Sequence, residues 1–281
     1  MARRHVFRTW DDYFIPGTSV LRNKFTAPGL PFGESDPVRF RELEEGAAAI
    51  RLVELAAHPV PGRFDYDHMK AIHRYIFQDV YEWAGQERVA PASFMVKTGP
   101  DVVNYPVGDP RAPQNVPYQY YPAGPALTEA AEEQYRRLAA KNLLRGMDRD
   151  RFVTELAEVW GELNVIHSFR EGNTRSQFVF FSCLAEQAGW RLEPSRFAPG
   201  APGREELVAA RFYSQATGRN DRLATVLGHT VVPVEDQGAP EGRRAATRRH
   251  LSAQINHRLS QRRQRPEAGG GAPHRERGRS R

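Results

Sequence analysis

The stretch from Asp148 to His167, DRDRFVTELAEVWGELNVIH, constrains the fold more than any other part of the chain. Its apolar residues recur at spacings of four, three, one, three and three: Phe152, Leu156, Val159, Trp160, Leu163 and Ile166. On an α-helix these spacings place the side chains in one broad apolar stripe. Because such a stripe must be covered by neighbouring elements, we predict that this helix is the buried centre of the fold.

Further helices are predicted before this one. The segment from residue 35 to 58 has Ser35 or Asp36 as a candidate N-cap and Pro37 in the first turn. Its apolar residues at steps of three and four predict the buried face, which would be formed by Phe40, Leu43, Ala47 and Ile50. Residues 64–85 predict a second helix that Asp65 caps and Gly85 stops, with one apolar face made of Met69, Ile72 and Ile76.

A third helix is predicted from Thr128 to about Leu144, and a last one near Arg204 to Tyr213. Between them, a new apolar helix starts after the Gly-Asn pair and carries Phe178, Val179, Phe181, Leu184 and Ala185. Residues 85–127 instead combine Pro, Gly and Tyr with short β-prone runs, which favours one small hairpin followed by irregular loop. We therefore expect a mainly α fold in a single domain with a small β-hairpin.

Cellular location can also be addressed from the sequence. We find no apolar run of the length that a membrane span needs, and the N-terminus MARRHVFRTWDDYF lacks the apolar centre of a signal peptide. Cys183 is the single cysteine, which excludes an internal disulfide framework and any cysteine-rich metal site and fits a reducing compartment. We therefore expect a soluble cytoplasmic protein without a membrane partner.

Charge is distributed unevenly between the body of the chain and its C-terminal end. The whole chain carries +6, but residues 241–281 hold twelve arginines against three glutamates, a net +9, which leaves −3 for residues 1–240. The Arg-, Gly- and Pro-rich end has too few apolar residues to offset its ordering entropy. We predict a disordered basic tail over residues 233–281, which either solubilises the chain or contacts nucleic acid by charge.

The turn between the two apolar helices contains the residues of an anion site. A helix N-terminus preceded by small residues offers free backbone N–H groups and the positive end of the helix dipole. Glycine permits close backbone approach, and an arginine can form paired hydrogen bonds with phosphate oxygens. The residues at these positions are Gly172, Asn173, Thr174 and Arg175.

Two neighbours of this anion site could supply chemistry. Glu171 is a hard oxygen ligand of the kind that Mg²⁺ takes when water and phosphates complete its shell. His167 ends the preceding helix, where it could act as a general base near neutral pH. Taken singly, each residue also has an ordinary interpretation as a cap, a turn or a solvated charge. Together they indicate phosphoryl or nucleotidyl transfer to a hydroxyl.

The order of these residues resembles a known family signature. HSFREGNTR, at residues 167–175, is similar to HxFx[DE]GN[GK]R of the Fic (filamentation induced by cAMP) domain proteins. The segments YFIPGTSVLRNKF, at residues 13–25, and FDYDHMKAIHRYIFQDVYEWAG, at residues 64–85, also resemble the family. The likeness covers most of residues 10–230 and excludes the basic tail.

The resemblance implies a Fic-type helical bundle with a β-hairpin flap, and transfer of AMP from ATP to a Ser, Thr or Tyr hydroxyl of a target protein. It divides the chain into an N-terminal segment (1–36), a core domain (37–232) and the tail (233–281). It implies the following roles: His167 as base, Phe169 as buried anchor, Glu171 as Mg²⁺ ligand, Gly172, Asn173, Thr174 and Arg175 as phosphate site, and Met95, Val96 and Lys97 as flap.

Two positions depart from the family pattern. Thr174 stands where adenylylating members have glycine and Doc-like kinases have lysine. Phe178 replaces a second arginine that holds the γ-phosphate in many AMP-transferring members. AMP transfer is the favoured activity, and the alternatives are a Doc-like protein kinase or a catalytically weak Fic-fold binding protein whose tail contacts nucleic acid. A helix-turn-helix DNA binder is disfavoured because the second helix begins with apolar residues.

Regulation by a built-in inhibitor is not expected. Family members are commonly inhibited by a helix with the pattern [ST]xxxE[GN], but Arg41, His167 and Gln237 precede the Glu-Gly pairs of this chain by four residues. The resemblance is therefore to the toxin class, whose inhibitor is a separate small antitoxin. By the same analogy, the target would be a type II topoisomerase subunit such as DNA gyrase.

Overall fold

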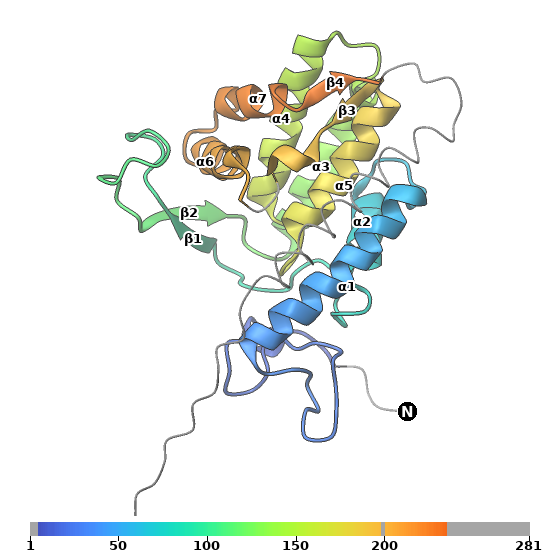
Figure 1. Cartoon of the computed structure of the whole chain (residues 1–281), viewed down its shortest axis with the longest axis vertical. Coiled ribbons are helices and arrows are strands. Elements are labelled where there is room, and N and C mark those ends of the chain that lie inside the picture. Colours follow the sequence, from blue (N-terminus) through green and yellow to red (C-terminus); the bar gives the residue numbers. More distant parts are fainter. Residues whose placement is uncertain (1–4, 198–199, 235–281) are drawn as a thin grey trace, which may run out of the picture.

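Helix α4 (Arg149–Ile166) lies at the centre of the molecule in the computed structural model, which describes residues 5–197 and 200–234 (Figure 1). The side chain of Asp148 caps the helix by accepting a hydrogen bond from the Arg151 N–H at 2.9 Å. All residues of the predicted apolar stripe are buried, which confirms that α4 is the central helix: Phe152, Leu156, Val159, Trp160, Leu163 and Ile166.

The other helices surround α4. Helix α4 contacts α3, α5, α6 and α7, while α2 packs on α5 and α1 packs on α2 (Figure 1). Their bounds are α1 (Pro37–Ala57), α2 (Tyr66–Phe77), α3 (Pro125–Ala140), α5 (Asn173–Gln187), α6 (Pro202–Thr217) and α7 (Asp221–Gly228). Short 3-10 turns lie at Asp11–Tyr13, Asn142–Leu144 and Pro194–Phe197. The prediction of a mainly helical fold with a small hairpin is confirmed.

The predicted hairpin is formed by β1 (Met95–Gly99) and β2 (Val116–Tyr120), which pair antiparallel with Lys97 opposite Tyr118. The irregular segment was expected after the hairpin, but residues 100–115 lie between its two strands. The hairpin projects from the bundle beside α6 (Figure 1). The Tyr118 ring stacks on Phe212 of α6 at 4.2 Å, and this contact anchors the hairpin to α6. A second two-stranded sheet, β3 (Trp190–Leu192) with β4 (Val231–Pro233), was not expected from the sequence.

Several predicted helix bounds were wrong. The third helix begins and ends earlier than predicted, at Pro125 and Ala140, because Pro125 occupies its first turn. The second helix ends at Phe77 rather than at Gly85. The last predicted helix extends over Pro202–Thr217, and α7 after it was missed because its eight residues are fewer than the stretch over which a helical period is judged.

The predicted buried face of α1 was only partly right, since Phe40 and Ala47 pack against the core but the other two residues do not. Asp36 does cap the helix, accepting from the Arg39 N–H at 2.7 Å, but Ile50 is 62% exposed and Leu43 is 36% exposed. The face that points inward carries Glu44, Ala48 and Leu55. Because the inward face includes a carboxylate, apolar spacing alone could not define it.

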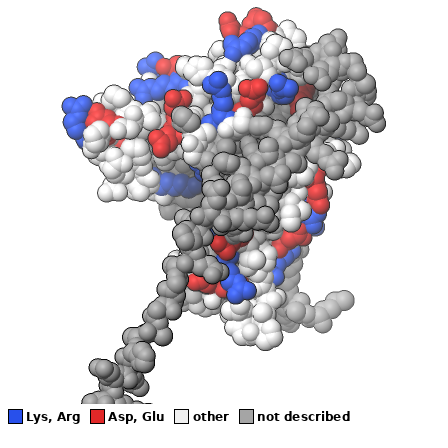
Figure 2. All heavy atoms as spheres, in the orientation of Figure 1, with Lys and Arg blue, Asp and Glu red and all other residues white. Residues whose placement is uncertain are grey.

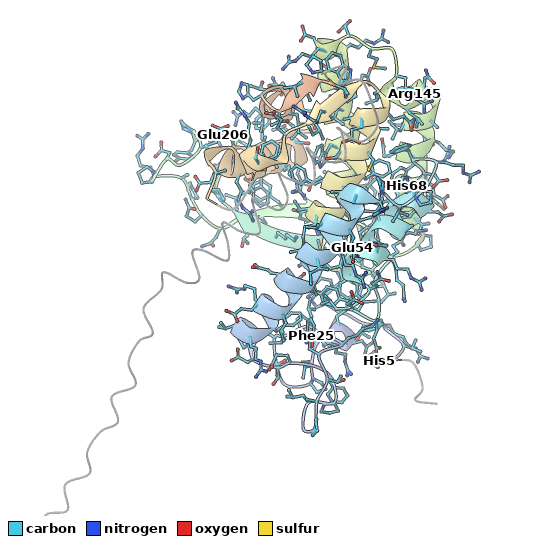
Figure 3. All side chains as sticks on the ribbon, turned by 45° about the vertical axis from the view of Figure 1, so that its right-hand side comes forward. His5, Phe25, Glu54, His68, Arg145 and Glu206 are labelled. Atoms are coloured by element: carbon cyan, nitrogen blue, oxygen red, sulfur yellow. The ribbon has the colours of Figure 1, made fainter. Side chains whose placement is uncertain are left out.

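The N-terminal segment packs on the same core as the helices. Tyr13 is buried, meets the Trp83 ring at 5.6 Å and accepts a hydrogen bond through its hydroxyl from the Val89 N–H at 3.1 Å. Figure 3 shows this segment, with Phe25, at the opposite end of the molecule from Glu206 of α6. The division at residue 36 remains a prediction.

The predicted tail begins in a described strand, since β4 includes Pro233, and residues 235–281 lie outside the described residues. Over the described residues, none of the helices has the length and apolar character to cross a membrane. On the face drawn in Figure 2, basic and acidic side chains are interspersed rather than gathered into areas of one sign.

Candidate active site

His167 occupies the C-cap of α4 in a left-handed backbone conformation, with φ 53° and ψ 60°. Its N–H donates to the Leu163 carbonyl at 3.2 Å, and its side chain is buried in the described structure. Glycine and asparagine are the usual residues at this conformation, and histidine adopts it at a cost. The backbone therefore turns sharply at His167, the residue that the sequence predicts as general base.

Arg88 holds the end of α4 in place and was missed by the sequence analysis. It is 1% exposed, and its Nε donates to the His167 carbonyl at 2.8 Å while its own N–H donates to the Ser168 carbonyl at 2.9 Å. Its Nη2 also donates to the carbonyl of Tyr121, just after β2. Carbonyl groups at a helix end lack intrahelical partners, so Arg88 satisfies that of His167 and ties the end of the hairpin to the turn between α4 and α5.

Phe169 is a buried anchor, as predicted, and its ring stacks on His73 of α2 at 3.9 Å. His73 accepts a hydrogen bond at Nδ1 from the Gly85 N–H at 2.8 Å, so Nε2 carries the proton and donates to the Glu171 carbonyl at 2.9 Å. Burial lowers the pKa of His73 to about 3, which keeps the ring neutral. His73 thus positions the backbone of Glu171, a role that the sequence did not indicate.

The Gly-Asn pair shapes the turn from within. Gly172 has φ +83°, and a Cβ at this position would lie 2.2 Å from the buried ring of Phe77. The Asn173 side chain accepts from the Phe169 N–H at 2.9 Å and donates to the Phe169 carbonyl at 2.7 Å. The Asn173 amide therefore closes the turn, and only its backbone remains for the predicted phosphate site.

The first turn of α5 meets the requirements of an anion site. Its N-cap is Gly172, and no side chain caps the helix, so N–H groups of the first turn are not occupied by a capping side chain. Thr174 is exposed there, and its Oγ1 accepts a hydrogen bond from Nη1 of Arg211 at 3.0 Å. Phe178, one turn later, is partly buried against the apolar core, with its ring 4.9 Å from Trp160 and 5.5 Å from Phe197.

Arg175 is held by a contact that the sequence did not predict. Its Nη2 lies 2.5 Å from Oε1 of Glu44, the buried carboxylate of α1, and its guanidinium lies 4.6 Å from the centre of the Phe77 ring. The nearest oxygen of Glu171 is 3.9 Å away. In this structure Arg175 is part of the packing between α1 and α5, and its role toward phosphate stays a prediction.

Glu171 fits the limited part that a protein plays in holding Mg²⁺. Its side chain is 48% exposed beside the α5 N-terminus, with Oε1 accepting from the Gly172 N–H at 2.9 Å. Among the described residues no group of three or more His, Cys, Asp or Glu side chains could hold a metal ion. One open carboxylate beside an anion site is sufficient when phosphates and water supply the other ligands.

Lys97 of the hairpin contacts His167 at the end of α4. Its Nζ lies 3.1 Å from Nε2 of His167 and 5.4 Å from the centre of the Tyr120 ring. Burial, followed by the positive charges of Lys97, Arg211 and Arg88, holds the pKa of His167 well below its usual value. His167 is therefore neutral. Of the other predicted flap residues, Met95 is buried and Val96 is 50% exposed on the same strand.

Known proteins resemble this chain over the region that contains the turn. A model of the Fic/DOC family matches residues 63–185. Protein adenylyltransferase VbhT of Bartonella schoenbuchensis is 32% identical over 77% of this chain, and the match spans 38% of that protein. Probable protein adenylyltransferase y4lH of Sinorhizobium fredii is 32% identical over 67% of this chain and 82% of that protein.

Solved structures show the same fold. The BepC protein of Bartonella tribocorum with bound AMPPNP has a TM-score of 0.62 at 22% identity, covering 80% of this chain and 98% of that one. The N-terminal Fic domain of an effector protein from Bartonella sp. AR 15-3 has a TM-score of 0.62 at 26% identity, covering 82% and 95%. With a relative matched over most of its length and the signature residues assembled in one turn, the chain belongs to the Fic/DOC family.

Proposed function

We propose that this protein is a protein adenylyltransferase that moves AMP from ATP to a hydroxyl side chain of a target protein. The observation that carries the proposal is the position of His167, a buried neutral imidazole beside an α5 N-terminus that no side chain caps. A base and an anion site are the two elements that transfer to a hydroxyl requires. Relatives that are named protein adenylyltransferases support this choice.

We infer the following reaction at the turn. The hydroxyl oxygen attacks the α-phosphorus, a new O–P bond forms, and the bond to the β-phosphate breaks with release of pyrophosphate. The hydroxyl proton passes to Nε2 of His167, so the ammonium of Lys97, 3.1 Å away, must first leave that nitrogen. N–H groups of the first α5 turn would stabilise the phosphate oxygens. Mg²⁺, held by Glu171, would supply neutralising positive charge.

Transfer of the γ-phosphate is the second candidate, and one observation favours it. The guanidinium of Arg211 lies against Thr174, so a positive charge is present near the position where Doc-like kinases carry lysine. A cation at this point could hold ATP in the opposite orientation. We rank it second because the named relatives are adenylyltransferases.

The finer assignments rest on the sequence resemblance. We infer a Ser, Thr or Tyr hydroxyl as acceptor, presented along the hairpin of Met95, Val96 and Lys97, because an exposed strand edge can pair with an extended peptide. We also infer a cytoplasmic toxin with a separate small antitoxin and a type II topoisomerase subunit as target. Nucleic acid would be contacted only through the basic tail, which lies outside the described residues.

Label transfer in bacterial lysate tests the proposal. The lysate would receive Mg²⁺ and ATP labelled at either the α- or the γ-phosphate, with His167→Ala and Glu171→Ala as comparison variants. A protein band labelled only from the α-phosphate and lost in both variants is the expected result. A band labelled only from the γ-phosphate would establish the second candidate. The absence of any labelled band, with purified antitoxin-free protein and intact ATP binding, would contradict transferase activity toward a bacterial target.

A further inference from the structure

Arg211, on α6, extends a guanidinium group to the first turn of α5 from a distant part of the sequence. Its Nη1 donates to Oγ1 of Thr174 at 3.0 Å, and its Nε donates to Oδ1 of Asn164 at 2.7 Å. A further donor, Nη2, also contacts the Asn164 side chain. Arg211 therefore joins α6 to the last turn of α4 and the first turn of α5, the two helix ends that flank His167.

The charge of Arg211 is unpaired by any carboxylate among the residues that the structure describes. Both of its hydrogen-bond partners are neutral side-chain oxygens, and burial lowers the pKa of its guanidinium. A buried or half-buried guanidinium normally pairs with an acid, because an uncompensated charge is costly to remove from water. A guanidinium has five N–H donors, and the observed bonds use three, so donors remain for a ligand.

Two ionisable groups lie close enough to Arg211 to be affected by its charge. Arg211 lowers the pKa of His167 and that of Lys97, and its contact with Thr174 places it at the first turn of α5. The ion pairs of Arg175 show the contrast, because that arginine is bound by the carboxylate of Glu44. Unlike Arg175, Arg211 therefore has no carboxylate partner among the described residues, and its charge is available to a ligand at the first turn of α5.

We infer that Arg211 is a phosphate-binding residue of the nucleotide site, an inference that rests on the proposed function. Residues 174 and 178 lie one turn apart on α5, and a long side chain on a helix leans toward the N-terminus. A side chain from position 178 would therefore reach over Thr174, the residue that Arg211 contacts. Phe178 instead packs against Trp160 and carries no charge. The cation near Thr174 comes from Arg211 of α6.

Nucleotide binding by the full-length protein tests this role independently of transfer. Titration calorimetry with ATP, pyrophosphate and adenosine would compare wild type with Arg211→Gln and Arg211→Lys. Arg204→Gln is the matched control, because Arg204 is exposed on the same helix. A charged hydrogen bond to phosphate predicts ATP and pyrophosphate binding weaker by roughly ten- to a hundredfold in Arg211→Gln, with a smaller loss in Arg211→Lys. Adenosine binding and the control should match wild type.

Two results would overturn the inference. Equal weakening of ATP and adenosine binding, together with a lower melting temperature, would mean that Arg211 only joins the helices. Wild-type ATP and pyrophosphate affinity in Arg211→Gln would mean that no phosphate reaches it. Failure of the proposed function is distinguishable, because it would appear as missing AMP transfer while the dependence of pyrophosphate binding on Arg211 persists. If wild type binds neither ATP nor pyrophosphate, both ideas are wrong.

Discussion

Replacing Gly172 by alanine should damage the catalytic turn by two separable effects. The first is conformational, because φ is +83° and the left-handed region costs an L-residue about 1–2 kcal/mol. The second is steric, because the new Cβ would lie 2.2 Å from Phe77, a ring with no exposed surface. Overpacking of a core costs about 1–3 kcal/mol. The expected loss of unfolding free energy is therefore about 2–5 kcal/mol.

Gly29→Ala is the matched control for this substitution. Gly29 also has φ +83°, but a Cβ there would meet nothing within 4 Å. It should therefore lose only the conformational part, about 1–2 kcal/mol. The difference between the two variants isolates the contact with Phe77.

Urea unfolding of the two variants beside wild type would measure this difference directly. Phe77 has little freedom to retreat, since its ring lies 4.8 Å from His73 and 5.7 Å from Tyr81. We expect Gly172→Ala to be less stable than Gly29→Ala by about 1–3 kcal/mol and to lose label transfer. Equal destabilisation of the two variants would refute the reasoning, because the turn would then have moved away from Phe77 without cost.

Three other substitutions test the contacts around the turn. Lys97→Met should raise the pKa of His167 by removing a nearby positive charge. In a profile of transfer rate against pH, the fall in rate at low pH should therefore begin at a higher pH. An unchanged profile would contradict the contact. Arg88→Met should lower the unfolding free energy by about 3 kcal/mol or more, because buried carbonyls lose their donor, and a small loss in urea unfolding would be inconsistent with this role. Glu44→Gln should lower the unfolding free energy by about 1–3 kcal/mol in the same measurement, because Arg175 loses its charged partner. An unchanged unfolding free energy would mean that the pair is absent in solution.

The parts of the site that could be predicted from the sequence are those that are contiguous in it. The α4 stripe identified the central helix, and the residues from His167 to Arg175 assemble in one turn between α4 and α5. Both signals are local, because a helix has a fixed period and a turn joins neighbours. The hairpin was predicted from local β-prone runs, but the position of its irregular segment was not, because the pairing of β1 with β2 spans residues 100–115.

The contacts that support the turn could not be predicted, because each joins residues far apart in the sequence. Arg88 binds the carbonyl of His167, His73 binds that of Glu171, and Arg211 binds Thr174. A single arginine or histidine carries no periodic signal that separates it from a solvated side chain. The error in the buried face of α1 has the same cause, because the partner of the buried Glu44 carboxylate lies on α5.

Net charge gives a misleading picture of this site for a related reason. Residues 1–240 carry −3 overall, yet the charges that depress the pKa of His167 are those of Lys97, Arg211 and Arg88. Only a local collection of cations, set by the packing of the hairpin and α6, can attract a polyphosphate to an acidic protein. A bound polyphosphate would in turn offset those cations and raise the pKa of His167 toward its usual value. His167 would then accept a proton most readily when the nucleotide is in place, which couples the strength of the base to the presence of its substrate.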